Sequence, residues 1–199
     1  MKLRECFEYI AGRWKSELVI LSAGNCSEMW WEVTRDSERA FYLEASMSLA
    51  SMFGAGIALG VPRTPVWVFS GDGAFCMNPG MLMVERQMNL PNLKHFLVSN
   101  RCYGSTYEAR LPNASANDYA SMARAMGIER VYRIDSLDAL QRDFASAVAQ
   151  PGHVFTVLEV EPVGKKLEEP PMDGPEMKYR FGRYIERMTG VRIFDGSLF

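Results

Sequence analysis

The sequence predicts an α/β protein with three layers, α/β/α, around a mainly parallel central sheet. Short apolar runs alternate along the chain with amphipathic segments of helical length. This alternation is typical of a parallel sheet covered by helices on both faces. Polar residues and glycines follow three of the apolar runs, at the strand ends where such sheets bind ligands. With 199 residues, 48% of them hydrophobic, the chain is long enough to bury one full core.

The first part of the chain predicts two helices and two strands. Apolar residues recur at helical spacing over residues 3–15, so we expect an amphipathic helix there. An apolar strand over 18–21 ends in a polar turn over 22–27, and 40–44 is a second short strand. A helix rich in small residues should cover 46–59. Three glycines are expected to let that helix pack closely: Gly54, Gly56 and Gly60.

From residue 66 onward, strands and helices alternate regularly. In chain order we expect strand 66–70, helix 79–89, strand 94–99, a polar loop through 117, helix 118–127, strand 130–134, helix 137–149 and strand 153–161. The carboxyl ends of parallel strands meet at one edge of a sheet. The polar strand ends at 22–27, 71–74 and 100–105 should therefore lie together.

The composition changes at Pro162, which divides the chain into a domain over 1–163 and a tail over 164–199. Prolines and acidic residues over 168–175 indicate a linker. Apolar residues beyond it suggest a helical arm: Tyr179, Phe181, Tyr184, Ile185 and Met188. We expect this arm to pack on a partner or back on the domain. A disordered end is the alternative, which the aromatic residues make less favourable.

Charge and hydropathy exclude several classes of function. The formal net charge is −2 and lysines and arginines do not cluster, so nothing indicates nucleic-acid binding. The first residues lack the apolar core of a signal peptide. No segment approaches the roughly 20 apolar residues that span a bilayer. We therefore expect a cytoplasmic protein.

Cysteines and histidines give no catalytic or metal signature. The four cysteines are widely spaced, with no Cys-x-x-Cys pair, so we expect free thiols and no iron–sulfur or structural zinc site. His95 and His153 lie inside apolar, strand-like runs. Burial suppresses the charged form of histidine, and both are expected to be buried structural residues.

The residues with the clearest chemistry are Asp72, in Gly71-Asp72-Gly73 at the end of strand 66–70, and Asn100, at the end of strand 94–99. If these strands are neighbours, the two side chains can share one hard cation. Oxygen donors suit Mg²⁺, which completes its shell with phosphate and water. The main-chain carbonyl of Cys102 is a candidate third ligand.

The flanking residues favour a metal-bound diphosphate over an ordinary turn, although a lone Gly-Asp-Gly would not. Gly71 and Gly73 let the backbone approach a phosphate, and the amides of Gly73 and Ala74 can donate to its oxygens. A strand precedes the motif and a helix follows it. Asn100 comes after a second strand, and Tyr103-Gly104-Ser105 follows directly.

This stretch resembles the diphosphate-binding domain of the thiamine-diphosphate-dependent enzymes. The family motif is Gly-Asp-Gly followed by an asparagine pair, and here twenty-five residues separate Gly73 from Ser99-Asn100. The resemblance implies that Asp72, Asn100 and the Cys102 carbonyl bind Mg²⁺. It also implies the thiamin diphosphate-binding fold and contacts to the cofactor from the residues after the asparagine: Tyr103, Gly104 and Ser105.

A second match lies upstream. Ala45-Ser46-Met47-Ser48 resembles the family's Gly-Ser-(large apolar)-Gly segment, with Ala45 and Ser48 replacing both glycines. The resemblance implies that Ala45, Ser46 and Met47 receive the aminopyrimidine ring and that Met47 holds the cofactor bent. An ordinary helix-core role is the alternative for Met47. Three residues of the first polar turn could face cofactor or substrate, although a plain turn explains them as well: Asn25, Cys26 and Ser27.

Within this family, residues 15–160 look most like the separately encoded beta subunit of sulfopyruvate decarboxylase and the matching half of phosphonopyruvate decarboxylase. This implies the diphosphate-binding (PP) subunit of a heteromeric 2-oxoacid decarboxylase, a carbon–carbon lyase. The alternatives are a carboligase subunit and an inactive cofactor-binding module. Electron transfer to ferredoxin is less favoured, because there is no cysteine cluster.

The resemblance also implies a partner. Family members carry an activating glutamate on a pyrimidine-binding (PYR) domain, for which this chain has no room. Glu44 could be a buried group near the pyrimidine segment, and Glu85 is expected to be a solvated helix residue. We assign no catalytic residue on this chain. An alpha subunit with the PYR domain should supply the glutamate, in an α₂β₂ or larger assembly that acts on a small 2-oxo acid.

Overall fold

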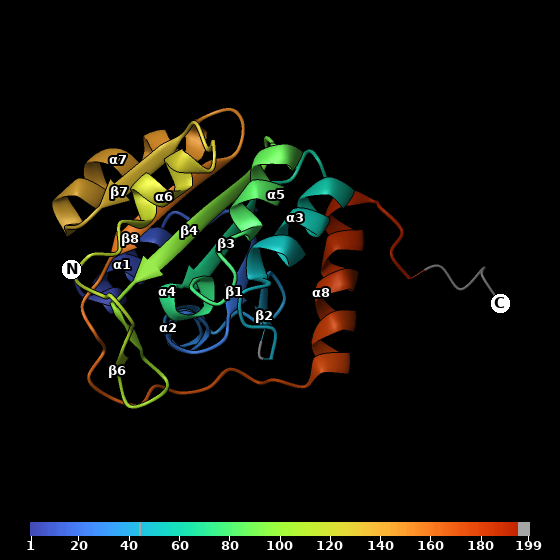
Figure 1. Cartoon of the computed structure of the whole chain (residues 1–199). Helices are drawn as coiled ribbons and strands as arrows, with labels where there is room; N and C mark the ends of the chain where they lie inside the picture. The colour runs from blue at the N-terminus through green and yellow to red at the C-terminus, as the bar shows by residue number, and fades with distance from the viewer. Residues whose placement is uncertain (44, 195–199) are drawn as a thin grey trace.

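The computed structural model describes residues 1–43 and 45–194, and its centre is a parallel sheet (Figure 1). All its strand pairs run parallel, in the order β2-β1-β3-β4-β8-β7. The strands are β1 (Leu18–Ser22), β2 (Ala40–Leu43), β3 (Val66–Gly71), β4 (Leu93–Ser99), β7 (Val131–Ile134) and β8 (Val154–Glu159). Each matches a predicted strand, with ends shifted by one or two residues.

Helices cover both faces of the sheet, which confirms the predicted three-layer α/β/α fold. One face carries α1 (Leu3–Ala11), α2 (Asn25–Thr34) and α7 (Leu137–Ala149). The other carries α3 (Ala50–Gly60), α4 (Asp72–Phe75), α5 (Met81–Met88), α6 (Tyr119–Ala125) and α8 (Gly174–Thr189). The central strands β1, β3 and β4 are buried along almost their whole length. Burial on both faces explains why they are continuous apolar runs.

The core on the α1 side is aromatic. Phe69 of β3 stacks on Phe96 of β4, with 4.8 Å between ring centroids. Trp30 lies 5.1 Å from Phe69, and Phe7 lies 5.2 Å from Phe69. All four side chains are almost fully buried. Rings of this size bury more apolar area than any other side chains, so this cluster fixes α1 and α2 against the middle of the sheet.

Helix α2 is the main element that the sequence analysis missed. It begins at Asn25, directly after β1, so the turn predicted over 22–27 contains only Ala23 and Gly24 outside regular structure. The signal was present, because Cys26, Met29 and Trp30 are buried at helical spacing. The polar residues at its start resembled a turn because residues of this kind also begin helices.

The helix predicted over 46–59 begins later, at Ala50. Residues 46–49 form a turn in which the Leu49 amide donates to the Ser46 carbonyl at 3.0 Å. Within it, Ser48 has a φ of 73°, a left-handed conformation that a helix does not contain. The predicted helices 3–15, 79–89 and 118–127 are also shorter than expected. Glu44 lies outside the described residues.

Three glycines of α3 were predicted to let this helix pack closely, and one of them does so. A Cβ on Gly54 would overlap the Val68 side chain of β3, so the helix lies directly on the sheet there. The prediction was wrong for Gly56 and Gly60, because a Cβ on either would meet no atom within 4 Å. They lie on the outer face of the helix, where the sequence could not distinguish packing from exposure.

After β8 the chain crosses the outside of α2 and returns to the sheet as α8 (Figure 1). Glu168 accepts two hydrogen bonds from Arg35 at the end of α2, both 2.5 Å long. Phe181 and Ile185 of α8 are buried, and Phe181 packs against Phe41 of β2 with 5.3 Å between centroids. The arm therefore packs on its own sheet beside the edge strand. None of the helices described is both long and apolar enough to cross a lipid bilayer.

Candidate functional site

The strand order places a crevice between β1 and β3. From β1 the chain passes through α2 to β2 on one side, whereas from β3 it passes through α4 and α5 to β4 on the other. The connections leave the two adjacent strands in opposite directions and lie on opposite faces of the sheet. Ligands of α/β proteins bind at such a switch point, outside the carboxyl ends of the strands. The topology alone therefore singles out the ends of β1 and β3.

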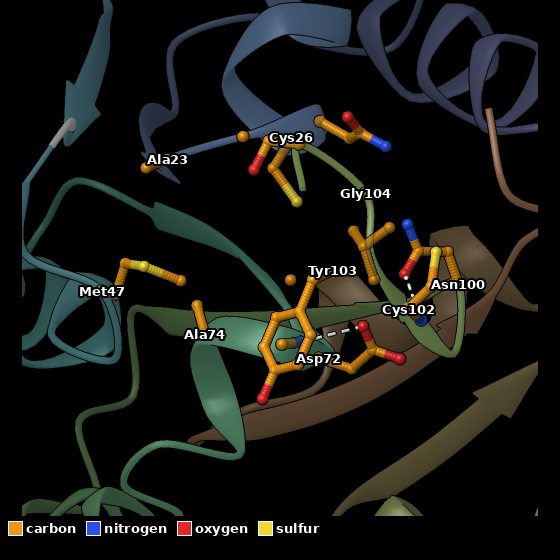
Figure 2. Close-up of a pocket in the computed structure, with 15 residues that line it drawn as sticks. Ala23, Cys26, Met47, Asp72, Ala74, Asn100, Cys102, Tyr103 and Gly104 are labelled. Atoms are coloured by element: carbon orange, nitrogen blue, oxygen red, sulfur yellow. Dashed lines mark hydrogen bonds between the residues drawn. The ribbon is translucent and has the colours of Figure 1, made fainter. Parts of the chain in front are cut away.

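A pocket lies at this place, with residues from all three polar strand ends (Figure 2). The predicted meeting of these ends is confirmed. Most lining residues come from three stretches of the chain: after β1, Ala23, Gly24, Asn25 and Cys26; from the last residue of β3 onward, Gly71, Asp72, Gly73 and Ala74; and from the end of β4 onward, Val98, Asn100, Cys102, Tyr103, Gly104 and Ser105. Met47 lines it from the turn before α3.

Asp72 is the first residue of α4 and is almost fully buried, at 1% exposure. Its Oδ1 accepts a hydrogen bond from the Gly73 amide at 2.9 Å. Its Oδ2 accepts from the Arg101 amide at 2.8 Å and from the Ser99 hydroxyl at 3.1 Å. Burial raises the pKa of the carboxyl to about 6, and these hydrogen bonds only partly offset that rise. A carboxylate in this position is stabilised by a cation.

The second half of the site is a tight hairpin that follows Asn100. Its strands are β5 (Cys102–Tyr103) and β6 (Ala109–Arg110), within the stretch predicted as a polar loop. Asn100 Oδ1 accepts a hydrogen bond from the Cys102 amide at 3.1 Å, which orients the side chain (Figure 2). The ring of Tyr103 lies against Gly73, where a Cβ would be 2.7 Å from Tyr103 Cδ1. The hairpin and the Asp72 turn therefore pack directly against each other.

Arg101 anchors this hairpin from outside the pocket. Its φ of 64° turns the chain sharply after Asn100. Its guanidinium forms a bidentate pair with Glu159 at the end of β8, at 2.5 and 3.2 Å, and donates to the carbonyl of Asn117 at 2.5 Å. Paired, fork-shaped hydrogen bonds of this kind fix geometry well. The Arg101 amide that holds Asp72 is thereby kept in place.

Not every predicted site residue lies in the pocket. Met47 lines it and is 40% exposed, so it is not a helix-core residue. In Figure 2, Met47 and Asn100 lie on opposite sides of the pocket. Ala45 and Ser46 are not among the lining residues. Ser27 is not among them either: it is buried, and its hydroxyl donates to the Ser22 carbonyl at 2.7 Å.

The sequence analysis missed Ala23, Gly24 and Val98 as lining residues. Gly24 has a φ of 85° and precedes α2, and a Cβ there would lie 3.2 Å from Ser105 Oγ. A strand followed by glycine and a helix is a known arrangement at ligand sites. It could have been recognised if α2 had been predicted.

The expectation for Glu85 was wrong. It is fully buried on α5, and its carboxylate contacts two imidazoles: His95 Nδ1 lies 3.0 Å and His153 Nε2 lies 2.9 Å from Oε2. Burial opposes the charge, but the two histidines outweigh it and hold the pKa of Glu85 well below its usual range. The predicted burial of both histidines is confirmed. Helical periodicity could not reveal Glu85, because its partners come from β4 and the segment before β8.

The pocket next to Asp72 is small, with a volume of about 50 Å³. It shares Asn25, Gly104 and Ser105 with a neighbouring cavity of about 590 Å³. Within the described part of the chain, no cluster of three or more His, Cys, Asp or Glu side chains could hold a metal ion. A cation at Asp72 would therefore need amide and carbonyl ligands.

The chain resembles several known proteins in sequence. A sequence profile described as "Thiamine pyrophosphate enzyme, C-terminal TPP binding domain" matches residues 23–160. The chain is 34% identical to the sulfopyruvate decarboxylase subunit beta of Methanothermobacter thermautotrophicus over 185 residues, 93% of this chain and 96% of that subunit. It is 32% identical to the phosphonopyruvate decarboxylase of Streptomyces viridochromogenes over 151 residues, 75% of this chain but 38% of that protein.

Among solved structures, the benzoylformate decarboxylase of Polynucleobacter necessarius superimposes with a TM-score of 0.70 at 16% identity. The match covers 85% of this chain and 34% of that one. At this identity it supports the fold.

Proposed function

The chain belongs to the thiamine pyrophosphate enzyme family, and on that premise we propose that it is the cofactor-binding subunit of a heteromeric 2-oxoacid decarboxylase. The observation that carries this proposal is the meeting of Asp72, Asn100 and Cys102 at one pocket. The likeness to sulfopyruvate decarboxylase beta subunits, which this chain matches over nearly their whole length, supports the subunit role.

We propose that Asp72 and Asn100 hold Mg²⁺ through side-chain oxygens and Cys102 holds it through its carbonyl. Three observations fit this role. The carboxylate is buried with a raised pKa, so a cation would stabilise it. Asp72 and Asn100 each accept hydrogen bonds from neighbouring main-chain amides, which orient their oxygens. Hard oxygen donors in small number, with room for phosphate and water, are typical of Mg²⁺ sites.

The remaining lining residues suit the cofactor thiamine diphosphate. Gly71, Gly73, Ala74, Gly104 and Ser105 line the pocket with small side chains or none, which suits the approach of a diphosphate to the backbone, and the Tyr103 ring forms one wall. Met47, across the pocket from Asn100, is placed to support the cofactor's aminopyrimidine side, with Ala45 and Ser46 in the same segment. When bound, the cofactor supplies the electron sink that decarboxylation of a 2-oxo acid requires. This chain's part is to bind and orient it.

A partner subunit is part of the proposal. Among the residues described as lining the pocket, Asp72 is the one carboxylate, so the activating glutamate should come from a PYR subunit. Met47 at 40% and Leu49 at 43% exposure present apolar surface beside the pocket. Exposed apolar surface at a ligand site favours burial by another chain. An α₂β₂ or larger assembly would place the cofactor between the subunits.

The substrate proposed is a small 2-oxo acid, with Asn25 and Cys26 facing it from the end of β1. Sulfopyruvate and phosphonopyruvate are the first compounds to test, because the relatives carry those names. A carboligase or an inactive cofactor-binding subunit are the other candidates. The replaced motif positions Ala45, Ser48 and Ser99 motivate the inactive alternative.

The deciding experiment titrates thiamine diphosphate with and without Mg²⁺ into the chain and its co-encoded partner, then measures CO₂ release from a panel of 2-oxo acids. We expect Mg²⁺-dependent binding, and turnover only in the complex. Tight binding with no turnover on any 2-oxo acid would favour the inactive subunit. Asp72→Ala should abolish Mg²⁺-dependent binding, while the matched control Asp135→Ala, at an exposed aspartate, should not. Full cofactor affinity in Asp72→Ala would refute the site.

A further inference from the structure

A chain of buried polar side chains runs behind the pocket, from α5 to the end of β3. Glu85 contacts His95 Nδ1 at 3.0 and 3.1 Å, and His95 Nε2 lies 2.5 Å from the Ser70 hydroxyl. Glu85, His95 and Ser70 are 0%, 2% and 6% exposed. Ser70 is the residue directly before Gly71-Asp72-Gly73. Buried polar networks are costly unless every member is paired, so this chain of contacts requires an explanation.

The proton positions in this chain follow from the charge of Glu85. An ionised carboxylate only accepts hydrogen bonds, so His95 Nδ1 must carry a hydrogen and donate to it. The other ring nitrogen, Nε2, shares a hydrogen bond with the Ser70 hydroxyl. Each member fixes the orientation of the next, in the order Glu85, His95, Ser70.

Serine, histidine and carboxylate in this order also form nucleophilic triads, but Ser70 is not placed to attack a substrate. It is buried, and it is not among the residues that line the pocket. Its neighbour Gly71 is held from the opposite side, because the Gly71 amide donates to Ser22 Oγ at 3.0 Å. The end of β3 is therefore tied both to β1 and, through His95, to α5.

We propose that Glu85, His95 and Ser70 are positioning residues that hold the end of β3 so that Asp72 enters the pocket at a fixed angle. We call the hydrogen-bonded path Glu85–His95–Ser70 the tether. Its role in catalysis rests on the proposed function, but the tether itself is a property of this chain. The cofactor turn, Gly71-Asp72-Gly73, joins the end of β3 to the start of α4, so a hydrogen bond at Ser70 acts one residue before this turn. Glu85 lies on α5, the second helix after the turn, and so links that helix to the strand before the turn.

His153 provides an internal control, because it contacts Glu85, whereas the hydrogen-bond partner of Ser70 is His95. Its Nε2 lies 2.9 Å from Glu85 Oε2, and its Nδ1 lies 3.3 Å from the Leu93 carbonyl. Replacing His153 perturbs the same buried carboxylate while leaving the path from Glu85 through His95 to Ser70 intact. A variant here should lower overall stability without loosening the turn.

The test is hydrogen–deuterium exchange of the amides of residues 71–75 in the full chain without cofactor. We expect Ser70→Ala and Glu85→Leu, which leaves no acceptor for His95 Nδ1, each to speed this exchange by about fivefold, the effect of losing one hydrogen bond. The double variant should exchange no faster than the faster single variant, because both changes break one path. His153→Gln should lower the melting temperature of the protein but change the exchange rate of residues 71–75 by less than about twofold. A change of about twofold is the error expected for independent sites.

Unchanged exchange in Ser70→Ala, or multiplied effects in the double variant, would overturn the inference. Ser70→Ala removes one oxygen and is the variant least at risk of misfolding. A second measurement connects the tether to function: the Kd of thiamine diphosphate with Mg²⁺ should rise about fivefold in Ser70→Ala and stay unchanged in His153→Gln. If the unmodified chain with its partner binds no cofactor, the proposed function fails, and the exchange rates still decide the tether.

Discussion

The Ser99 hydroxyl donates a hydrogen bond to Asp72 Oδ2 at 3.1 Å, so the residue that departs from the family motif still serves the site. Ser99 is the last residue of β4 and is fully buried. The register pairs β4 with β3 along the whole of β3, which brings Ser99 and Asp72 to the same edge. The serine hydroxyl is enough for this contact, because its single O–H group reaches the Asp72 carboxylate.

Loss of that hydroxyl should weaken Mg²⁺ binding most at low pH. In Ser99→Ala the carboxylate loses one of its three donors, so the pKa of Asp72 should rise further. Protons then compete with Mg²⁺ more strongly. We expect affinity for Mg²⁺ with thiamine diphosphate to fall about tenfold at pH 6 and less at pH 8, given about 1.5–3 kcal/mol for a charged hydrogen bond. Ser99→Thr keeps the hydroxyl and is the control. Equal affinity of Ser99→Ala and the unmodified chain at pH 6 would contradict this role.

The buried charge of Asp72 should make the metal-free protein less stable as pH rises. The pKa of Asp72 is raised from an ordinary value of 3.8 to about 6, so the folded state binds this proton more tightly than the unfolded state does. Its contribution to the free energy of unfolding is therefore lost between pH 4 and 6 as pH rises, by roughly 3 kcal/mol.

Asp72→Asn stays neutral and should escape that loss. Urea unfolding without Mg²⁺ should show the variant gaining stability relative to the unmodified chain between pH 4 and pH 7.5. Asp135→Asn, at an exposed position, is the matched control. A stability difference between Asp72→Asn and the unmodified chain that is constant across this range would show that Asp72 is not a strained buried carboxylate.

Gly73 should tolerate no side chain. A Cβ there would lie 2.7 Å from the Tyr103 ring, so Gly73→Ala must push the hairpin away from the Asp72 turn. We expect the Kd for thiamine diphosphate with Mg²⁺ to rise at least about tenfold, since a misplaced ligand of this kind costs more than about 1.4 kcal/mol. Calorimetric titration measures it. Gly56→Ala is the control: it has open space around it and should stabilise α3 by up to about 1 kcal/mol without affecting binding. Normal binding by Gly73→Ala would show that the hairpin can move freely.

Ser48 occupies the place of a glycine in the family segment, and its φ of 73° shows why glycine is suited there. A left-handed conformation costs a residue with a side chain about 1 kcal/mol. Ser48→Gly should therefore raise the melting temperature slightly and preserve cofactor binding. Ser46→Gly, two residues earlier and outside the left-handed region, should not stabilise and is the comparison. Thermal unfolding measures the melting temperature of both variants. A lower melting temperature in Ser48→Gly would contradict backbone strain at Ser48.

The site could be predicted from sequence where each residue's place follows from its own strand. Asp72 and Asn100 come directly after continuous apolar runs, and a parallel sheet brings all such strand ends to one edge. The prediction of a shared oxygen-lined pocket needed only the order of elements and the period of the apolar residues. The chemistry of Asp72 was correspondingly clear.

Other features depended on contacts between distant parts of the chain. Periodicity placed Glu85 on a helix but could not show that its face turns inward, because its partners His95 and His153 come from elsewhere. The same limit affected Gly56. The sequence pattern around a helical glycine is the same whether the glycine packs against the sheet or faces solvent, as Gly56 does.

The sequence by itself determined the α/β alternation, the carboxyl-edge location of the pocket and the places of Asp72 and Asn100 at that edge, since these follow from local residue patterns. Only the tertiary structure decided that β1 and β3 are neighbours at a switch point, that Ser99 completes the hold on Asp72, and that a buried carboxylate ties α5 to the end of β3. The physical reason is the same in each case. Burial and pairing of polar groups depend on which segments meet in space. The sequence of one segment does not show which other segments will contact it.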